Sequence, residues 1–142
     1  MNCPAQPVRT GFGCLTTKHY SGFPIWNTKT TDYNVMNTTL HRDVVKEFTE
    51  AFRKNGLRAM LYYSILDMHQ GIRPHTITKA HIQLIKGQLT ELLTQYGEID
   101  ALVIDGWDAP WSRISYDDVP FDDIYYLVKS FPKEKIILHN TV

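Results

Sequence analysis

The spacing of apolar residues constrains the fold of this chain more than any other feature. Short apolar runs, typical of buried strands, alternate with longer segments whose apolar residues recur at helical spacing. Connections of this length allow right-handed crossovers, so the strands are expected to form a parallel sheet in an α/β fold. The expected strands are residues 11–18, 58–64, 99–104 and 135–138, and the expected helices are residues 43–55, 82–96 and 121–131.

Composition is that of one folded domain. The chain has 142 residues, of which 43% are hydrophobic, and this is enough for a sizeable core. Fifteen basic and fifteen acidic residues give a net charge of zero, which does not favour nucleic acid or an anionic membrane as a partner. The first residues lack the pattern of a signal peptide, and no apolar run approaches the ~20 residues of a membrane span. Composition leaves the compartment open.

The two cysteines, Cys3 and Cys14, are too few for a disulfide framework. Cys14 lies in an apolar stretch, so we expect its thiol to be buried.

Each predicted strand ends in side chains that can bind a polar ligand. In a parallel sheet these ends share one edge, where ligand sites of α/β folds are built. We therefore expect one site there, although strands often end in polar residues by chance. Side chains alternate along a strand, so only one of the two tyrosines should face it. The candidates are His19, Tyr62 with Tyr63, Asp105, and His139 with Asn140.

The segment Asp105-Gly106-Trp107 suits carbohydrate chemistry. Tryptophan packs against the apolar faces of sugar rings, and a carboxylate can attack or stabilise an oxocarbenium-like centre. The alternative is that Asp105 caps a turn through nearby backbone groups.

Other chemistries lack their motifs. The six histidines and two cysteines form no HExxH, His-x-His or CxxC, so no metal site is expected. No glycine-rich phosphate loop and no serine nucleophile elbow is present, and no redox cofactor is expected. Four aspartates at positions 117, 118, 122 and 123 fit a solvated helix start better than a cation site.

Three blocks of the sequence resemble glycoside hydrolase family 29, the α-L-fucosidases, over residues 14–142. They are KHYSGFPIWNTKTTDYNVMNTT, RDVVKEFTEAFRKNGLRAMLYYS and IDALVIDGW. The resemblance implies a catalytic (β/α)₈ barrel and a retaining mechanism on terminal α-L-fucosyl residues, with no cofactor. It also implies a fucosylated glycan as the partner, rather than nucleic acid or a membrane.

By the same resemblance, Asp105 matches the catalytic nucleophile. A second carboxyl group about 5 to 5.5 Å away would act as acid and base, and in the family it lies downstream of these residues. The substrate-binding residues that the resemblance implies are His19, Tyr20, Trp26, Tyr62 and Trp107.

The sequence departs from the family at several positions. Tyr20 and Ser21 stand where a histidine and an aspartate are usual, and Val103 stands where a tryptophan is often found. His139-Asn140-Thr141 replaces the expected sugar-binding arginine. Tyr20, Ser21 and Val103 favour an alternative, namely a divergent barrel that binds fucose or a glycan without cleaving it.

A (β/α)₈ barrel takes about 250 residues, so 142 residues supply about four of its eight units. We expect residues 1–142 to form a single partial catalytic barrel domain, with residues 1–10 as an unstructured or non-homologous start. The chain would then be a fragment of a longer enzyme and inactive by itself. A complete open α/β domain of the flavodoxin or receiver kind is a weaker alternative, because the phosphate loop and the acidic cluster are missing.

Overall fold

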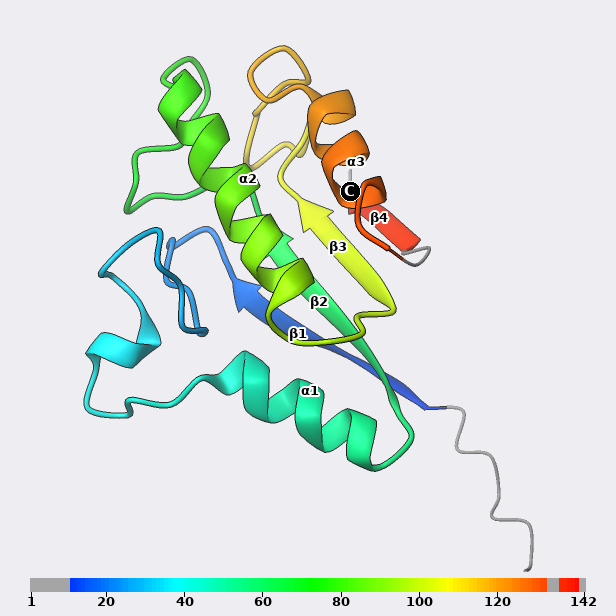
Figure 1. Ribbon diagram of the computed structural model, residues 1–142. Coiled ribbons are helices and arrows are strands. Elements are labelled where there is room, and N and C mark those ends of the chain that lie inside the picture. Colours follow the sequence, from blue (N-terminus) through cyan, green and yellow to red (C-terminus); the bar gives the residue numbers. More distant parts are fainter. Residues whose placement is uncertain (1–10, 133–135, 141–142) are drawn as a thin grey trace, which may run out of the picture.

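The predicted alternation of strands and helices is present in the computed structural model, which describes residues 11–132 and 136–140. Its strands are parallel and lie in the order β1-β2-β3-β4, as the crossover argument predicts (Figure 1). The elements are β1 (Phe12–Lys18), η1 (Val35–Asn37), α1 (Val44–Lys54), β2 (Arg58–Ser64), α2 (Lys79–Thr94), β3 (Ala101–Asp105), α3 (Phe121–Lys129) and β4 (Ile136–Asn140). Cys3, Lys135, Thr141 and the expected start at residues 1–10 lie outside the described residues.

The ends of α1 follow from local chemistry. Asp43 caps the helix, since its side chain accepts a hydrogen bond from the backbone N–H of Lys46. At the other end, Gly56 adopts a φ of +68°, which stops the helix and turns the chain into β2. Asp43 also accepts hydrogen bonds from the Tyr96 hydroxyl at 2.8 Å and from the Asn27 backbone at 3.1 Å. This one carboxylate therefore ties the start of α1 to the end of α2 and to the long loop after β1.

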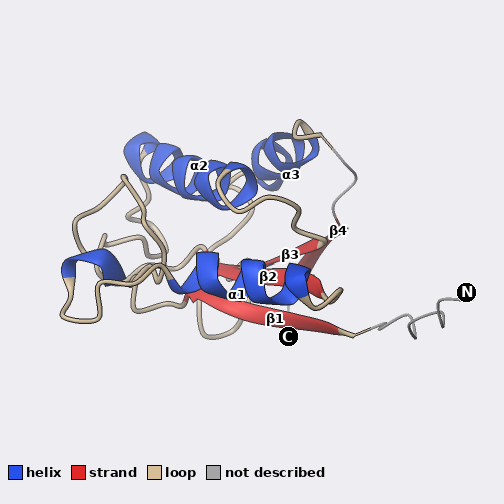
Figure 2. Ribbon diagram, turned by 60° about the horizontal axis from the view of Figure 1, so that its bottom comes forward, coloured by secondary structure: helices blue, strands red, loops and turns tan. Residues whose placement is uncertain are grey.

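Helices cover one face of the sheet. Alternate strand residues on that face are almost fully buried, and they are Ala59, Leu61, Tyr63, Leu102 and Ile104. Gly13 lets α1 approach this face, because a Cβ atom there would lie 2.6 Å from the Phe52 ring. Figure 2 shows α2 and α3 next to each other over the sheet.

The other face of the sheet is not covered by the described residues. Cys14 and Thr16 of β1 are exposed on it, and Tyr62 and Val103 are only partly buried. The prediction of a buried Cys14 thiol is therefore wrong, because Cys14 points away from the helices on an edge strand. In a closed barrel, this face would line the interior.

The third strand begins later than the apolar pattern predicts. Ile99 is buried, but it precedes the ladder. Asp100 exchanges two hydrogen bonds with the Ala59 backbone, one through its own N–H and one through its carboxylate, each at 2.9 Å. These bonds align β3 with β2. In the described part of the chain, no helix is long and apolar enough to cross a membrane.

Candidate active site

The carboxyl ends of the strands meet at one edge of the sheet. Lys18 of β1 pairs with Tyr63 of β2, and Ser64 pairs with Asp105 of β3. The β3–β4 ladder continues to Asn140. The predicted convergence of strand ends is therefore confirmed at the level of the backbone. The side chains of His139 and Asn140 lie outside the described part of the structure.

Asp105 is the last residue of β3, and its side chain is only 4% exposed. Oδ2 accepts a hydrogen bond from the Tyr62 hydroxyl, whereas Oδ1 is buried and has no hydrogen-bond partner. A carboxylate that capped a turn would accept a backbone N–H, and Asp105 is not seen to accept one in the described structure. The oxygen without a partner sets Asp105 apart at the sheet edge, because a buried acceptor without a hydrogen bond is costly and rare.

The backbone after Asp105 turns sharply. Gly106 has a φ of +120°, and a Cβ atom at this position would lie 2.7 Å from Cγ1 of Ile65. Only glycine fits both conditions. This turn directs the chain away from the sheet directly after the carboxylate.

Tyr62 and Tyr63 point to opposite faces of the sheet, as strand alternation predicts. Burial raises the pKa of the Tyr62 phenol, and its hydrogen bond to the negatively charged Asp105 raises it further. Tyr62 therefore stays protonated and remains a donor to Asp105. Tyr63 is fully buried instead, and its hydroxyl donates to Oε1 of Gln88 at 2.7 Å.

The turn after β1 places two further aromatic rings beside Tyr62. The imidazole of His19 stacks on the Tyr62 ring, with centroids 5.6 Å apart and planes at 15°. Tyr20 meets His19 edge to face at 4.9 Å, and 52% of its surface is exposed. The structure thus brings four of the six predicted site residues together: Asp105, Tyr62, His19 and Tyr20.

The two remaining candidates are buried in the core. Trp26 has no exposed surface, and its indole N–H donates to Glu91 of α2 at 2.9 Å. Trp107 is also fully buried, and its indole N–H donates to the Val119 carbonyl at 2.7 Å. Neither ring offers a face to a sugar in this structure, so the stacking predicted for Trp107 and the substrate contact predicted for Trp26 do not fit this arrangement. Their role here is to anchor loops to the core.

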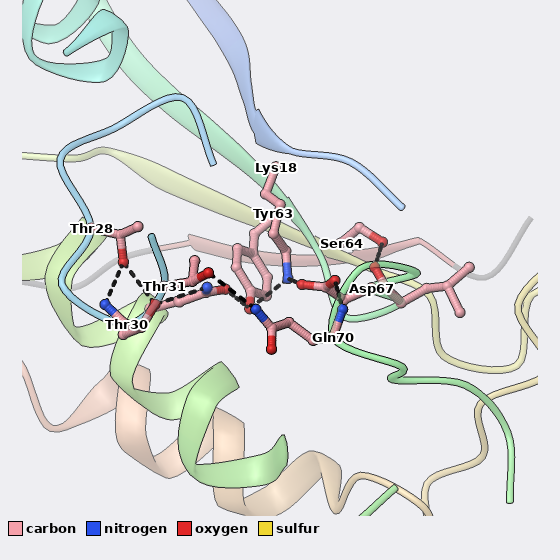
Figure 3. Close-up of polar contacts among 10 residues, drawn as sticks. Lys18, Thr28, Thr30, Thr31, Tyr63, Ser64, Asp67 and Gln70 are labelled. Carbon is pink, nitrogen blue, oxygen red and sulfur yellow. Dashed lines mark hydrogen bonds and ion pairs between the residues drawn. The ribbon is translucent and has the colours of Figure 1, made fainter. Parts of the chain in front are cut away.

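A buried ion pair, which the sequence did not reveal, joins the end of β1 to the β2–α2 loop (Figure 3). The ammonium of Lys18 lies 2.9 Å from Oδ2 of Asp67, and both side chains are fully buried. It also donates to the Tyr63 hydroxyl at 3.1 Å. Burial lowers the pKa of Lys18, and the charge of Asp67 opposes that shift. Figure 3 shows the network continuing through Gln70 to Thr31 of the long loop.

The ion pair lies against the turn at residues 19–22, which we call the histidine turn. Gly22 closes the turn with a hydrogen bond from its N–H to the His19 carbonyl and has a φ of +82°. A Cβ atom there would lie 2.0 Å from Oδ1 of Asp67. The Tyr20 carbonyl accepts a hydrogen bond from Met68 at 2.8 Å. Asp67 and Met68 of the β2–α2 loop thus help to position His19 and Tyr20.

Metal binding has no support in the described part of the chain, where no three His, Cys, Asp or Glu side chains gather closely enough to hold an ion.

Parallel βα units with a buried carboxylate and aromatic side chains at the carboxyl edge define the class of the protein, a (β/α)-barrel type of α/β domain. The family model described as Alpha-L-fucosidase matches residues 10–141, and the chain belongs to this family. The fold and family that the sequence predicts are therefore confirmed.

Individual relatives agree with this assignment. Alpha-L-fucosidase 1 of Arabidopsis thaliana is 38% identical over 95 residues, which are 65% of this chain and 18% of the relative. The human tissue alpha-L-fucosidase is 30% identical over 134 residues, which are 83% of this chain and 28% of the relative. The solved structure of alpha-L-fucosidase isoenzyme 1 from Paenibacillus thiaminolyticus superposes with a TM-score of 0.70 at 28% identity, covering 86% of this chain and 33% of that one. The chain thus spans a third or less of these proteins.

Proposed function

We propose that this chain supplies four strands, with the three helices that connect them, to the catalytic barrel of a retaining α-L-fucosidase, which acts on terminal α-L-fucosyl residues of glycoconjugates. The observation that carries the proposal is the geometry of Asp105, with one oxygen held by Tyr62 and the other buried without a partner. Family membership supports the choice of sugar.

In the proposed reaction, Oδ1 of Asp105 attacks the anomeric carbon of the fucosyl group, and the bond to the leaving oxygen breaks. The product is a covalent glycosyl-enzyme ester, which water hydrolyses in a second step. Tyr62 fixes the carboxylate through Oδ2, so the free oxygen faces the sugar. A second carboxyl group protonates the leaving oxygen, and we place it in a part of the complete enzyme outside these 142 residues.

The substrate contacts in this proposal come from His19, Tyr20 and Tyr62. Tyr20 contacts His19, His19 stacks on Tyr62, and Tyr62 binds Asp105. The three side chains offer an imidazole and two phenols as hydrogen-bonding groups for sugar hydroxyls. Trp26 and Trp107 support the loops from the core instead.

The test is to measure release of an aryl leaving group from a synthetic α-L-fucoside by the complete enzyme that carries these residues. We expect Asp105→Ala to lower the turnover number by at least about 10³-fold, since the covalent step is lost. Glu50→Ala is the control, because this carboxylate is exposed on α1, away from the candidate site. Its activity should stay within about twofold of the parent.

An azide experiment tests directly whether Asp105 is the nucleophile. In Asp105→Ala, azide can enter the space left by the carboxylate and form the fucosyl azide of inverted configuration, a product that a positioning role would not give. An Asp105→Ala enzyme that keeps most of its activity would refute the assignment of Asp105 as the nucleophile.

A second candidate function is binding of a fucosylated glycan without hydrolysis. Val103 favours it, because this residue pairs with Tyr62 next to the site and stands where the family often has a tryptophan. Ser21 and Tyr20 favour it as well. Binding of L-fucose by an enzyme that hydrolyses no fucoside would support this second function.

A further inference from the structure

Strand β1 contains one residue more than its ladder with β2 needs. Thr16 pairs with Tyr62 and Lys18 pairs with Tyr63, so a two-residue step in β1 faces a one-residue step in β2. The extra residue, Thr17, forms a β-bulge. It is fully buried, and its hydroxyl donates to the Tyr62 carbonyl at 2.7 Å. The bulge lies just before the histidine turn, and bulges redirect the side chains that follow them.

The bulge decides on which face of the sheet the next side chains emerge. In an unbroken ladder, alternation would place Lys18 on the uncovered face and His19 on the face that the helices cover. The structure has the opposite arrangement. The Lys18 ammonium lies 4.4 Å from the centroid of the Tyr63 ring on the covered face. The His19 imidazole stacks on Tyr62, which donates to Asp105. The extra residue therefore brings His19 to the face that carries the candidate site.

The buried ion pair accounts for this register. Lys18 reaches Asp67 from the covered face, at 2.9 Å and with both side chains fully buried (Figure 3). Asp67 is itself fixed, because its other carboxylate oxygen accepts from the Gln70 N–H at 2.8 Å and its backbone exchanges two hydrogen bonds with Ile72. A buried carboxylate without its cation is costly, so the register that buries Lys18 is favoured over the regular one.

The chain after the bulge is closed by backbone hydrogen bonds. The Thr17 carbonyl accepts from the Ile25 N–H at 3.0 Å, and the His19 carbonyl accepts from the Gly22 N–H at 3.0 Å. These two bonds join residues 17–25 into a short closed loop. A change of face at Lys18 would therefore move His19 with it.

We propose that Lys18 is a positioning residue, which holds the bulge at Thr17 through its ion pair with Asp67 and thereby keeps the His19 imidazole beside Tyr62 for contact with the substrate. The inference rests on the proposed function for the contact between His19 and a sugar. The placement of His19 by Lys18 can be measured without any substrate.

The kinetic test is a double-mutant cycle in the complete enzyme, with an aryl α-L-fucoside as substrate. Lys18→Gln removes the charge, and we expect it to lower kcat/KM at least about fivefold. In a His19→Ala background the same change should alter kcat/KM by less than about twofold, because Lys18 then has no imidazole to position. Lys18→Arg keeps a cation and should lose less activity than Lys18→Gln.

The structural test follows the His19 imidazole by NMR in the enzyme labelled with ¹³C-histidine, without substrate. The Tyr62 ring current shifts its ring signals, and the spectrum of His19→Ala assigns them. We expect these signals to move toward the values of free histidine in Lys18→Gln and to stay in place in Lys18→Arg. His81, which accepts a hydrogen bond from the Thr78 N–H at the start of α2, is the internal reference.

Two further variants separate positioning from stability. Tyr96→Phe removes a hydrogen bond of 2.8 Å to Asp43, outside the histidine turn. It should lower the melting temperature but leave the His19 signals in place and kcat/KM within about twofold. Thr17→Val replaces Lys18→Gln if that variant does not fold. It removes the hydroxyl that donates to the Tyr62 carbonyl, and it should move the His19 signals and kcat/KM in the same direction.

Three results would overturn the proposal. They are unchanged His19 signals in the folded variant of the bulge, an equal loss of kcat/KM with and without His19, and a loss of kcat/KM in Tyr96→Phe as large as in Lys18→Gln or its substitute. If the parent enzyme hydrolyses no fucoside, the proposed function fails, and the histidine signals alone decide whether Lys18 positions His19.

Discussion

Removing the cation next to the histidine turn should destabilise the protein strongly. In Lys18→Met the side-chain length is retained, but Asp67 stays fully buried without its partner at 2.9 Å. Truncating one member of a buried ion pair typically costs about 3–5 kcal/mol, because the remaining charge is desolvated and uncompensated. A domain has only about 5–15 kcal/mol of stability, so this loss is a large share of the total.

The assay is urea denaturation followed by tryptophan fluorescence and far-UV circular dichroism. The double variant Lys18→Met/Asp67→Leu supplies the decisive comparison. It removes both charges together, although it also loses the hydrogen bond from the Gln70 N–H to Asp67 at 2.8 Å. We expect the double variant to be more stable than Lys18→Met by at least about 1 kcal/mol.

Two results would refute this reasoning. One is a Lys18→Met variant that loses less than about 1 kcal/mol, the range of an exposed pair. The other is a double variant whose loss of unfolding free energy equals the sum of the losses in Lys18→Met and Asp67→Leu. Such additivity would show that the two side chains are not coupled.

Three further predictions concern single positions. Gly22→Ala should lower the melting temperature, because a φ of +82° and a Cβ atom 2.0 Å from the Asp67 carboxylate strain the turn, and unchanged melting would contradict this. Tyr62→Phe should reduce kcat of the complete enzyme on an aryl fucoside about ten- to a hundredfold, since Asp105 loses its only described donor; steady-state kinetics with unaltered kcat would argue against it. The backbone N–H of a neighbouring serine holds the pKa of Asp118 below its ordinary 3.8, so its contribution to stability is full above that pH and is lost as the pH falls through the lowered pKa. Melting curves of Asp118→Asn should therefore differ from the parent near neutral pH and converge with it in strong acid.

Much of the fold could be predicted because local signals and tertiary structure agree. Asp43 and Gly56 bound α1 at the positions where a carboxylate cap and a left-handed glycine are expected. The alternation of Tyr62 and Tyr63 also follows from strand geometry alone. Parallel pairing then brings Asp105 to the same edge as His19.

The burial of loop residues could not be predicted, because loops lack the regular repeat that marks buried positions in helices and strands. Trp26 and Trp107 lie in irregular segments next to the site, where an aromatic residue can serve a ligand or the core equally well. The burial of Lys18 was not predicted, because lysines are almost never buried without a partner and its partner lies 49 residues away in the sequence. Cys14 was misjudged because an apolar strand on the sheet edge is covered on one face only.

The free oxygen of Asp105 has a consequence for how the protein balances stability against reactivity. A buried acceptor without a donor costs about 1–3 kcal/mol, and among the described residues no group donates to this oxygen. A substitution that gave this oxygen a permanent donor would stabilise the fold and block the position where a sugar would react. Screens for thermostable variants should therefore enrich changes around Asp105 that also silence the site.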